Sequence, residues 1–386
     1  MAQLHKMQLD RRDSITTIEN SILRLVREIG EGAIRAEHSF SLRIGKSTSA
    51  GPFHDIWASL ALASLSSKCG SGSVVASGYQ SWSGLDEVEP GQLNEQSLPF
   101  TAAGLFAVEA ELPIVTDNEA RQPLDARKVM DLLARRHFML GRGTGRERIV
   151  VETDPDHSIA PTFASDYFDF ERFKIALLDI RREVEVGSEL RGMKVANFGN
   201  NELLSRLLFE IRQNGYEHAR NANSVRLLKL KKWAFNNRPQ AAEWAAAFPE
   251  LKSYIETSFP DSGPTHFYEA SISDFGEGIL DSFLHSARGR SYEGHDRANL
   301  IENLLHTQLS SKTNDPNAGK GIEDALWAAQ NMGAFVSLRT GEFWKFQDSR
   351  WGEIGLRDCG KSEELAKITG THWQIIYPGQ PADRRG

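Results

Sequence analysis

The spacing of hydrophobic residues switches between helical and strand patterns several times in the first 120 residues. Between 14 and 36, isoleucine, leucine and valine recur every three or four residues with charged residues between them, which predicts an amphipathic helix. Further segments follow the same two patterns: strands at 39–44, 73–77 and 112–116, and helices at 55–66 and 98–111. Helices and strands that alternate in this way predict a small α/β domain.

Turn-forming residues predict where this first domain ends. After the region above, the composition predicts a loop at 84–96, a helix at 125–140 and a Gly/Arg-rich turn at 141–148. The proline-containing stretch 154–166 is the expected boundary. It divides the chain into a domain at 1–160 and a second domain at 161–386.

The overall composition is that of a soluble globular protein. The chain has 386 residues, more than one core commonly holds, which agrees with two domains. Hydrophobic residues make up 40% of the chain and charged residues 25%, the usual balance of a folded protein. The net charge of -7 argues against binding through bulk positive charge, so a nucleic-acid partner is not indicated.

Cysteine usage and hydropathy predict a cytoplasmic protein that is not inserted in a membrane. Cys69 and Cys359 are the two cysteines and form no CxxC pair, as is common in a reducing cytosol. The first 30 residues are polar and charged and lack the apolar run of a signal peptide. The longest apolar stretch, 56–65, is too short to span a bilayer.

The segment 202–219 carries polar residues at helical spacing. Its leucines form an apolar stripe with Ile211, whereas Glu210, Asn214 and His218 recur every four residues along another face. Alone, such a polar face is typical of a solvated helix surface, so its meaning depends on the rest of the chain.

Three glycine-containing motifs follow this helix. A strand-like run leads into Asp274-Phe-Gly-Glu-Gly278, where spaced glycines let the backbone turn tightly and approach a ligand. Gly319-Lys-Gly321 precedes a predicted helix, and glycines in that position offer backbone N–H groups to phosphate oxygens. Gly370-Thr371 then opens a final strand.

In this order the four motifs resemble the N-box, G1 box, G2 box and terminal Gly-Thr strand of the GHKL ATPases. This superfamily includes gyrase B, heat-shock chaperones, histidine kinases and MutL, and the resemblance covers about 197–378. It implies an α+β fold in which a Bergerat-type α/β sandwich, a mixed sheet with helices on one face, follows the smaller α/β domain. It also implies ATP as the ligand and Mg²⁺ as the ion that bridges its phosphates.

The roles known for the family apply to the matching positions of this sequence. Asn214 corresponds to the asparagine whose side-chain oxygen binds Mg²⁺. Glu210, one turn earlier, corresponds to the carboxylate that activates the attacking water. Asp274 corresponds to the aspartate that accepts a hydrogen bond from the adenine amino group, and Gly276 and Gly278 let the nucleotide lie close to the backbone.

The G2 box and the final strand supply the other site residues that the resemblance implies. Gly319 and Gly321 correspond to the lid hinge and the phosphate cradle, with Lys320 between them as a further nucleotide contact. Thr371 resembles the threonine that supports the adenine-binding aspartate. His218 fills an N-box position that the family leaves variable, so we expect it to have no catalytic role.

Two longer segments complete the comparison with the family. Residues 279–319 would form an ATP lid that orders over nucleotide and loosens after product release. Within it, 297–309 predicts a helix, and Lys312 stands in a polar strip from which it could reach phosphate. The insertion 233–264 has no assigned role and is either a partner surface or an extra helical hairpin.

Glu210 favours hydrolysis over phosphotransfer, because histidine kinases of this fold usually carry a non-acidic residue at that position. The possible phosphoacceptors, His38, His54 and His137, stand in no clear two-helix hairpin. We therefore expect Mg-dependent ATP binding and slow hydrolysis, used as a conformational switch. A serine or histidine protein kinase and a non-hydrolysing, nucleotide-gated scaffold are the alternatives.

The first half resembles, in its arrangement of helices and strands, the STAS-like segment that precedes some bacterial ATP-binding domains. That resemblance implies a regulatory or interaction domain at 1–160 with no chemistry of its own. A protein partner or an ATP-dependent homodimer is the expected assembly.

Overall fold

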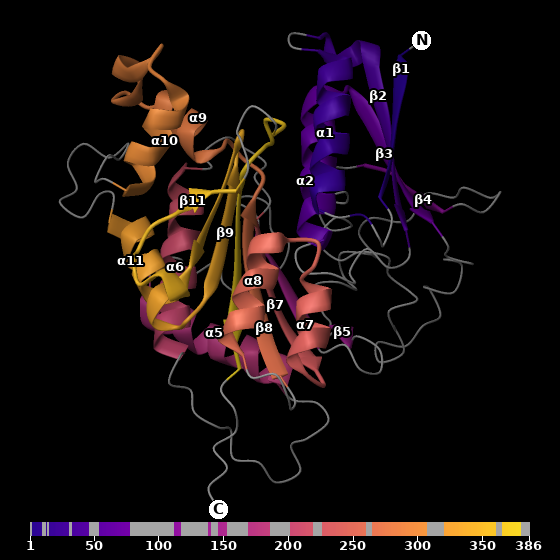
Figure 1. Ribbon diagram of the computed structural model, residues 1–386. Coiled ribbons are helices and arrows are strands. Elements are labelled where there is room, and N and C mark those ends of the chain that lie inside the picture. The colour runs from indigo at the N-terminus through magenta and orange to yellow at the C-terminus, as the bar shows by residue number, and fades with distance from the viewer. Residues whose placement is uncertain are drawn as a thin grey trace, which may run out of the picture.

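Two β-sheets lie on either side of a pair of helices, α1 (Ile15–Ile29) and α2 (His54–Lys68) (Figure 1). The computed structural model describes residues 2–9, 13, 15–30, 33–45, 54–77, 112–116, 138–139, 146–152, 169–185, 201–218, 226–259, 265–306, 320–359 and 365–379. The protein is thus a mixed α+β structure, as the sequence predicts at this coarse level.

The smaller sheet has parallel strands in the order β1-β2-β3-β4. They are β1 (Gln3–Leu9), β2 (His38–Gly45), β3 (Ser71–Ser77) and β4 (Ile114–Thr116). Helices α1 and α2 connect the first three, as parallel strands require a crossover. The predicted α/β pattern is confirmed, but β1 was missed. In β1, His5, Met7 and Leu9 are buried and alternate with exposed residues.

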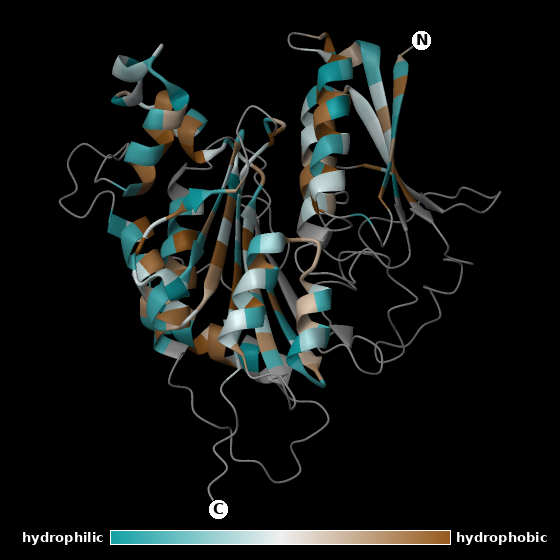
Figure 2. Ribbon diagram, viewed as in Figure 1, coloured by the Kyte–Doolittle hydropathy of each residue, from teal (hydrophilic) through white to brown (hydrophobic). Residues whose placement is uncertain are grey.

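Helix α2 is apolar on all sides because it lies between the two sheets. Its residues 57–65 are at most 2% exposed, whereas α1 shows the apolar and polar sides of an amphipathic helix (Figure 2). One continuous hydrophobic core encloses α2, with Leu42 of the small sheet at one side and Phe335 and Trp344 of the large sheet at the other. The two sheets therefore share a core.

The larger sheet has the strand order β11-β10-β9-β12-β8-β7-β6-β5. Its strands are β5 (Phe138–Met139), β6 (Arg146–Glu152), β7 (Arg226–Phe235), β8 (Thr265–Asp274), β9 (Phe335–Thr340), β10 (Phe343–Asp348), β11 (Arg357–Asp358) and β12 (Thr371–Pro378). All pairings among these described strands are antiparallel, so the expected mixed sheet is wrong. The last strand, β12, inserts between β8 and β9 and runs opposite to both.

Helices cover both faces of this sheet, which corrects the expectation of helices on one face. Helices α5 (Phe170–Glu185), α6 (Asn201–His218) and α11 (Lys320–Asn331) pack on one face. Helices α7 (Arg238–Trp244) and α8 (Pro249–Ser258) pack on the other, together with α1 and α2. Helices α9 (Ile279–Leu284) and α10 (Arg297–His306) join the first group. Three short 3₁₀ helices lie at Arg35–Glu37, Gly289–Tyr292 and Ser349–Trp351.

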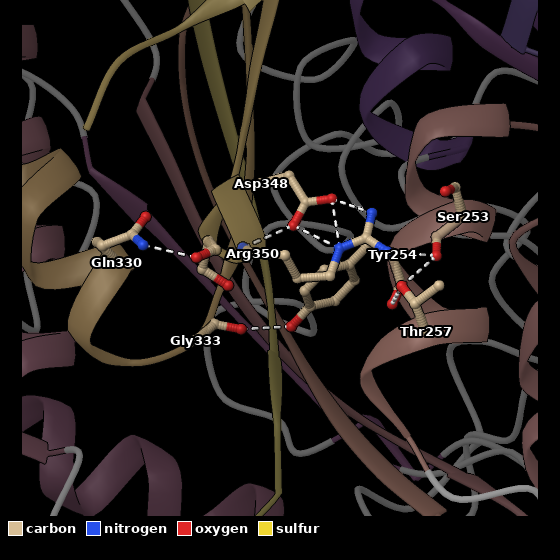
Figure 3. A network of polar contacts seen from close by, with 8 residues as sticks. Ser253, Tyr254, Thr257, Gln330, Gly333, Asp348 and Arg350 are labelled. Carbon is tan, nitrogen blue, oxygen red and sulfur yellow. Dashed lines mark hydrogen bonds and ion pairs between the residues drawn. The ribbon is translucent and has the colours of Figure 1, made fainter. Parts of the chain in front are cut away.

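The insertion 233–264 thus contains a helical hairpin that is tied firmly to the large sheet (Figure 3). The hydroxyl of Tyr254 donates to the carbonyl of Gly333, and burial raises the pKa of this hydroxyl above its usual value. Arg350 pairs with Asp348 and donates to the carbonyl of Ser253 at 2.8 Å. These contacts join α8 to the ends of β9 and β10.

Strands β5 and β6 belong to the large sheet although both precede residue 160. A boundary near 160 therefore does not separate the two sheets, because 138–152 pair with β7 and its neighbours. The predicted helix 125–140 is wrong at Phe138–Met139, which form strand β5, and the predicted turn 141–148 is wrong from Arg146 on, where strand β6 begins. The predicted loop 84–96, the helix 98–111 and the boundary segment 154–166 lie outside the described residues.

Candidate functional site

Helix α6 presents Glu210 and Asn214 along the edge of its buried side. Leu204, Leu207 and Leu208 recur at helical spacing and are fully buried against the sheet. Glu210 and Asn214, one turn apart, are only half-buried. The apolar stripe thus fixes the rotation of α6 and leaves the acid and the amide at the margin of the core. The side chain of His218 lies outside the described part of the chain.

The beginning of α11 lies directly against these two side chains. A β-carbon added at Gly321 would stand 2.9 Å from Oε2 of Glu210 and 3.2 Å from Nδ2 of Asn214. Small buried residues, Ala325 and Ala328 among them, let α11 pack close to α6. The first N–H groups of a helix have no partner within it and attract anions. This places an anion-attracting helix end beside a carboxylate and an amide.

Asp274 and Thr371 lie in one row across the large sheet, which also includes Thr340. Asp274 faces Thr371 across β8 and β12, and Thr371 faces Thr340 across β12 and β9. The hydroxyls of the two threonines are 3.3 Å apart, and the backbone N–H of Gly276 donates to Oδ1 of Asp274 at 3.2 Å. Asp274 is 7% exposed and Thr371 5%. The row thus collects buried hydrogen-bonding groups at one end of three strands.

The row also adjoins α6, so the two groups of predicted residues form one site. A β-carbon at Gly215, next to Asn214, would lie 3.8 Å from Oδ2 of Asp274. The acid at the end of β8 therefore neighbours the helix that carries Glu210 and Asn214. The sequence predicts these residues from separate motifs, and the fold brings them together.

Two glycines allow the backbone to close tightly around the row. A β-carbon at Gly278 would stand 2.9 Å from Oγ1 of Thr340, whose hydroxyl accepts a hydrogen bond from the N–H of Ile279 at 3.0 Å. Gly370 has φ of +84°, and a β-carbon there would lie 1.9 Å from the carbonyl oxygen of Asp274. Other residues are excluded from position 370 by both strain and contact.

A neutral histidine, His372, borders the row on the sheet face that packs against α1, α2, α7 and α8. Burial lowers the pKa of His372 to about 3, against the effect of its hydrogen bond to the carbonyl of Thr369, and the charge of Arg339 lowers it further. The ring lies 5.2 Å from that of Phe275, centre to centre. No formal positive charge therefore stands at His372 near neutral pH.

The described part of the predicted lid, 279–306, contains helices α9 and α10, which pack against the rest of the structure. Leu280 of α9 and Leu304 of α10 belong to the same hydrophobic core as α6 and α11. Arg297 pairs with Asp281 at 2.9 Å, and Lys367 pairs with the same carboxylate at 2.8 Å. Burial alone would raise the pKa of Asp281, but hydrogen bonds and charge from Lys367 and Arg297 lower it below its ordinary value.

The remaining predicted residues divide between exposed and undescribed positions. Lys320 is the first residue of α11 and is exposed. Gly319 and Lys312 lie outside the described residues. Sequence reasoning missed Thr340 as a site residue, although it ends a strand of alternating residues just before the Gly341 turn, a position that could have marked it.

The side chains present suit Mg²⁺ better than a softer metal. Carboxylate and amide oxygens are hard ligands, and Mg²⁺ is usually held by one or two of these together with substrate phosphates. Among the described residues, no group of three or more His, Cys, Asp and Glu side chains is placed to hold a metal ion. Asn214 and Glu210 supply one amide oxygen and one carboxylate of this kind beside the start of α11.

None of the described helices is long and apolar enough to cross a membrane. Comparison of the chain with protein-family models, with curated proteins and with solved structures gave no match.

Proposed function

We propose that this protein binds ATP with Mg²⁺ and hydrolyses it slowly, using the bound state as a conformational switch. The observation that carries the proposal is the meeting of Glu210, Asn214 and the start of α11, where a side chain at position 321 would displace the ends of both polar side chains. A carboxylate, an amide oxygen and the backbone N–H groups of a helix start are together the parts that phosphoryl transfer to water needs.

Each group has a distinct role in the proposed reaction. The amide oxygen of Asn214 would hold Mg²⁺, which supplies charge neutralisation for the phosphates. The N–H groups at the start of α11 would bind phosphate oxygens. The Glu210 carboxylate would accept a proton from the attacking water as its oxygen bonds to the γ-phosphorus. The bond from the γ-phosphorus to the bridging oxygen then breaks, and ADP leaves with that electron pair.

The row of buried groups would bind the other end of the nucleotide. The Asp274 carboxylate can accept a hydrogen bond from an exocyclic amino group such as that of adenine. A guanine would present a carbonyl oxygen there and offer the Asp274 carboxylate no donor from the base, which disfavours it. Thr371 and Thr340 would hold the end of β8 in place through their contact.

The test combines nucleotide binding by calorimetry with phosphate release, for wild type, Glu210→Gln, Asn214→Ala and a control. Glu210→Gln should retain ATP binding within about threefold and lose hydrolysis by at least 100-fold, as is usual for loss of a general base. Asn214→Ala should weaken binding only when Mg²⁺ is present. Glu202→Gln, an exposed glutamate of the same helix that pairs with Lys174, should behave as wild type.

The outcomes separate the possible functions. Hydrolysis by Glu210→Gln at the wild-type rate would remove Glu210 from the chemistry. Binding by wild type without phosphate release would point to a kinase that lacks its substrate or to a nucleotide-gated scaffold. No ATP binding at all would refute the proposal.

A further inference from the structure

A buried ion pair connects the N-terminal helices to the large sheet. Glu19 of α1 and Arg339 of β9 are 2% and 0% exposed. Nε of Arg339 donates to Oε1 of Glu19 at 2.7 Å, and its Nη2 donates to Oε2 at 3.2 Å. The indole of Trp57 in α2 also donates to Oε1 at 3.2 Å, and its ring lies 5.2 Å from that of Trp344. Both N-terminal helices thus contribute to one contact.

Arg339 uses the rest of its guanidinium to hold two backbone segments. Its Nη1 donates to the carbonyls of Gly341 and Phe343 in the β9–β10 turn. Its Nη2 donates to the carbonyl of Ala366 at 2.6 Å. A buried charge with this many fixed partners determines where both segments lie, because a displaced partner would leave part of it unsatisfied.

Both segments lead directly into the candidate nucleotide site. The turn begins beside Thr340, and the N–H of Gly341 would be 3.1 Å from a β-carbon at Gly278. The segment at Ala366 continues through Ile368, whose N–H donates to the carbonyl of Gly341 at 3.0 Å, to Gly370 and the row beyond it. Arg339 is therefore connected, through two hydrogen-bonded backbone segments, to the groups that would bind the base.

We propose that Arg339 is a positioning residue for the base-binding end of the site and that Glu19 sets its position. Docking of the N-terminal helices and nucleotide binding are then coupled, so that each strengthens the other. This inference rests on the proposed function, since it concerns the regulation of the same site. By linkage, an effect of docking on ATP affinity requires an equal effect of ATP on docking.

The chemistry of the sheet face beside Arg339 favours a contact that can open. Ser271, Ser273, His372 and Gln374 lie on this face and are completely buried. In the part of the chain that the structure describes, the two serine hydroxyls, Nδ1 of His372 and both amide atoms of Gln374 have no hydrogen-bond partner. Water would satisfy these atoms, so an opened state regains hydrogen bonds that the closed state lacks. Exposure of apolar side chains to water would form no such hydrogen bonds.

The test uses the full chain with Glu19→Gln, which keeps an acceptor for the Trp57 indole but removes the charge. ATP–Mg²⁺ affinity is measured by calorimetry, and docking by hydrogen exchange of the α1 amides with and without nucleotide. In wild type, ATP should slow exchange in α1. In Glu19→Gln, affinity should fall about tenfold, within the usual range of coupling, and ATP should no longer slow that exchange.

Glu269→Gln is a matched control. Glu269 is a fully buried glutamate of the same face, accepts the indole N–H of Trp233 at 2.7 Å and pairs with Lys229 at 3.4 Å, yet none of these partners belongs to the N-terminal helices. It should keep ATP affinity within twofold and keep the effect of ATP on α1. Trp57→Phe offers a milder second variant, with an expected loss of about threefold.

The results separate failure of this inference from failure of the proposed function. Wild type that binds ATP, together with Glu19→Gln and Trp57→Phe that keep both affinity and the α1 response, would overturn the coupling alone. An equal loss of ATP affinity in Glu269→Gln would also overturn the coupling, because removal of any buried charge on this face would then lower the affinity. Wild type that binds no ATP would overturn both ideas.

Discussion

Both faces of the eight-stranded sheet are buried, but one is mostly apolar, whereas the other, the polar face, mixes apolar residues such as Phe267, Phe335 and Trp344 with many polar ones. The face under α5, α6 and α11 presents Leu228, Leu230, Ala270, Ile272, Val336, Leu338, Trp373 and Ile375. The face toward α7, α8 and the N-terminal helices presents Lys229, Lys231, Glu269, Ser271, Ser273, Ser337, Arg339, His372 and Gln374. No side chain of the second set belongs to a residue more than 3% exposed.

The difference indicates which part of the molecule is fixed and which can be released. Apolar surface is held by the hydrophobic effect alone, and its exposure costs about 25 cal/mol per Å². Buried charges are stable only with matched partners, and water can replace those partners when the contact opens. We therefore expect α6 and α11 to stay in place, whereas the N-terminal helices depend on specific polar contacts such as Glu19–Arg339 in addition to the apolar core that they share with the sheet.

Among changes on the polar face, breaking the Glu19–Arg339 ion pair should lower the stability of the protein most. Arg339→Met would leave Glu19 buried with the Trp57 indole as its one hydrogen-bond donor among the described residues. We expect the free energy of unfolding to fall by about 3–5 kcal/mol, the usual cost of an uncompensated buried charge. Urea denaturation followed by circular dichroism measures it, and a loss below about 1 kcal/mol would mean that the pair is not buried in solution.

The double variant Glu19→Leu with Arg339→Met sharpens this prediction. Replacing both members of a buried ion pair with apolar groups is often neutral, so most of the lost stability should return. Stability would then be regained without the charge contact. If the double variant is as unstable as the single one, the loss comes from the backbone carbonyls that Arg339 holds rather than from Glu19.

The buried histidine of the polar face should make stability depend on pH. The pKa of His372 is about 3 in the folded protein, below its ordinary value of 6.5, because burial disfavours the charged form. The unfolded chain therefore binds more protons below pH 6.5, and stability present above that pH is lost as pH falls toward 3. Between pH 7 and pH 4, His372→Gln should lose about 3 kcal/mol less than wild type.

Urea denaturation of both proteins at the two pH values gives this difference directly. Carboxylates titrate in both and largely cancel. Glutamine can still donate to the carbonyl of Thr369, which accepts a hydrogen bond from His372. Equal pH dependence of the two proteins would mean that His372 is accessible to protons in the folded state.

Local patterns were enough to predict the helices that carry the site. The leucine stripe of α6 and the glycines around Asp274 and Gly321 are short motifs whose spacing specifies the local backbone. The order of these motifs also anticipated their meeting, because Glu210, Asn214 and Gly321 are in contact distance in the fold. The ligand and the chemistry of the site are still predictions.

The polar face could not be predicted, because alternation in a strand is ambiguous. A run such as Phe335–Thr340, with Ser337 and Arg339 on one side, is the pattern of a strand with one side in water. That side is covered by α1, α2, α7 and α8, and the contact with α1 joins Arg339 to Glu19, more than 300 residues away in sequence. The domain boundary near 160 is wrong for a related reason, because the pairing of β6 with β7, which are distant in sequence, leaves no local signal in either segment.

On the apolar face, a change at the edge should affect turnover and spare stability. Gly321→Ala adds a β-carbon that meets the flexible ends of Glu210 and Asn214, while alanine suits a helix better than glycine. We expect ATP hydrolysis to fall about 10- to 100-fold, as a small misplacement of catalytic groups commonly causes, with unfolding free energy unchanged or slightly raised. Phosphate release and urea denaturation on one preparation test both parts.

A contrary result for Gly321→Ala would be informative. Full activity would mean that Glu210 and Asn214 move aside at no cost and that their fixed distance from α11 is unimportant. Ala325→Gly, deeper in the same helix, is the control. It should lower stability by about 0.5–1 kcal/mol through helix propensity and leave turnover nearly unchanged.

The smallest expected effect distinguishes paired from unpaired groups on the polar face. Ser271 and Ser337 face Gln374 from its two neighbouring strands, and all three are fully buried. Ser337 accepts the indole N–H of Trp344 at 2.9 Å, whereas the Ser271 hydroxyl has no partner among the described residues.

Ser337→Ala should therefore lower the free energy of unfolding by about 1–2 kcal/mol, because a buried donor loses its acceptor. Ser271→Ala removes a group that is already unsatisfied, so it should be neutral or stabilise by up to about 1 kcal/mol. If both serines cost the same in urea denaturation, water reaches Ser271 in the closed protein, and the polar face is less dry than its burial indicates.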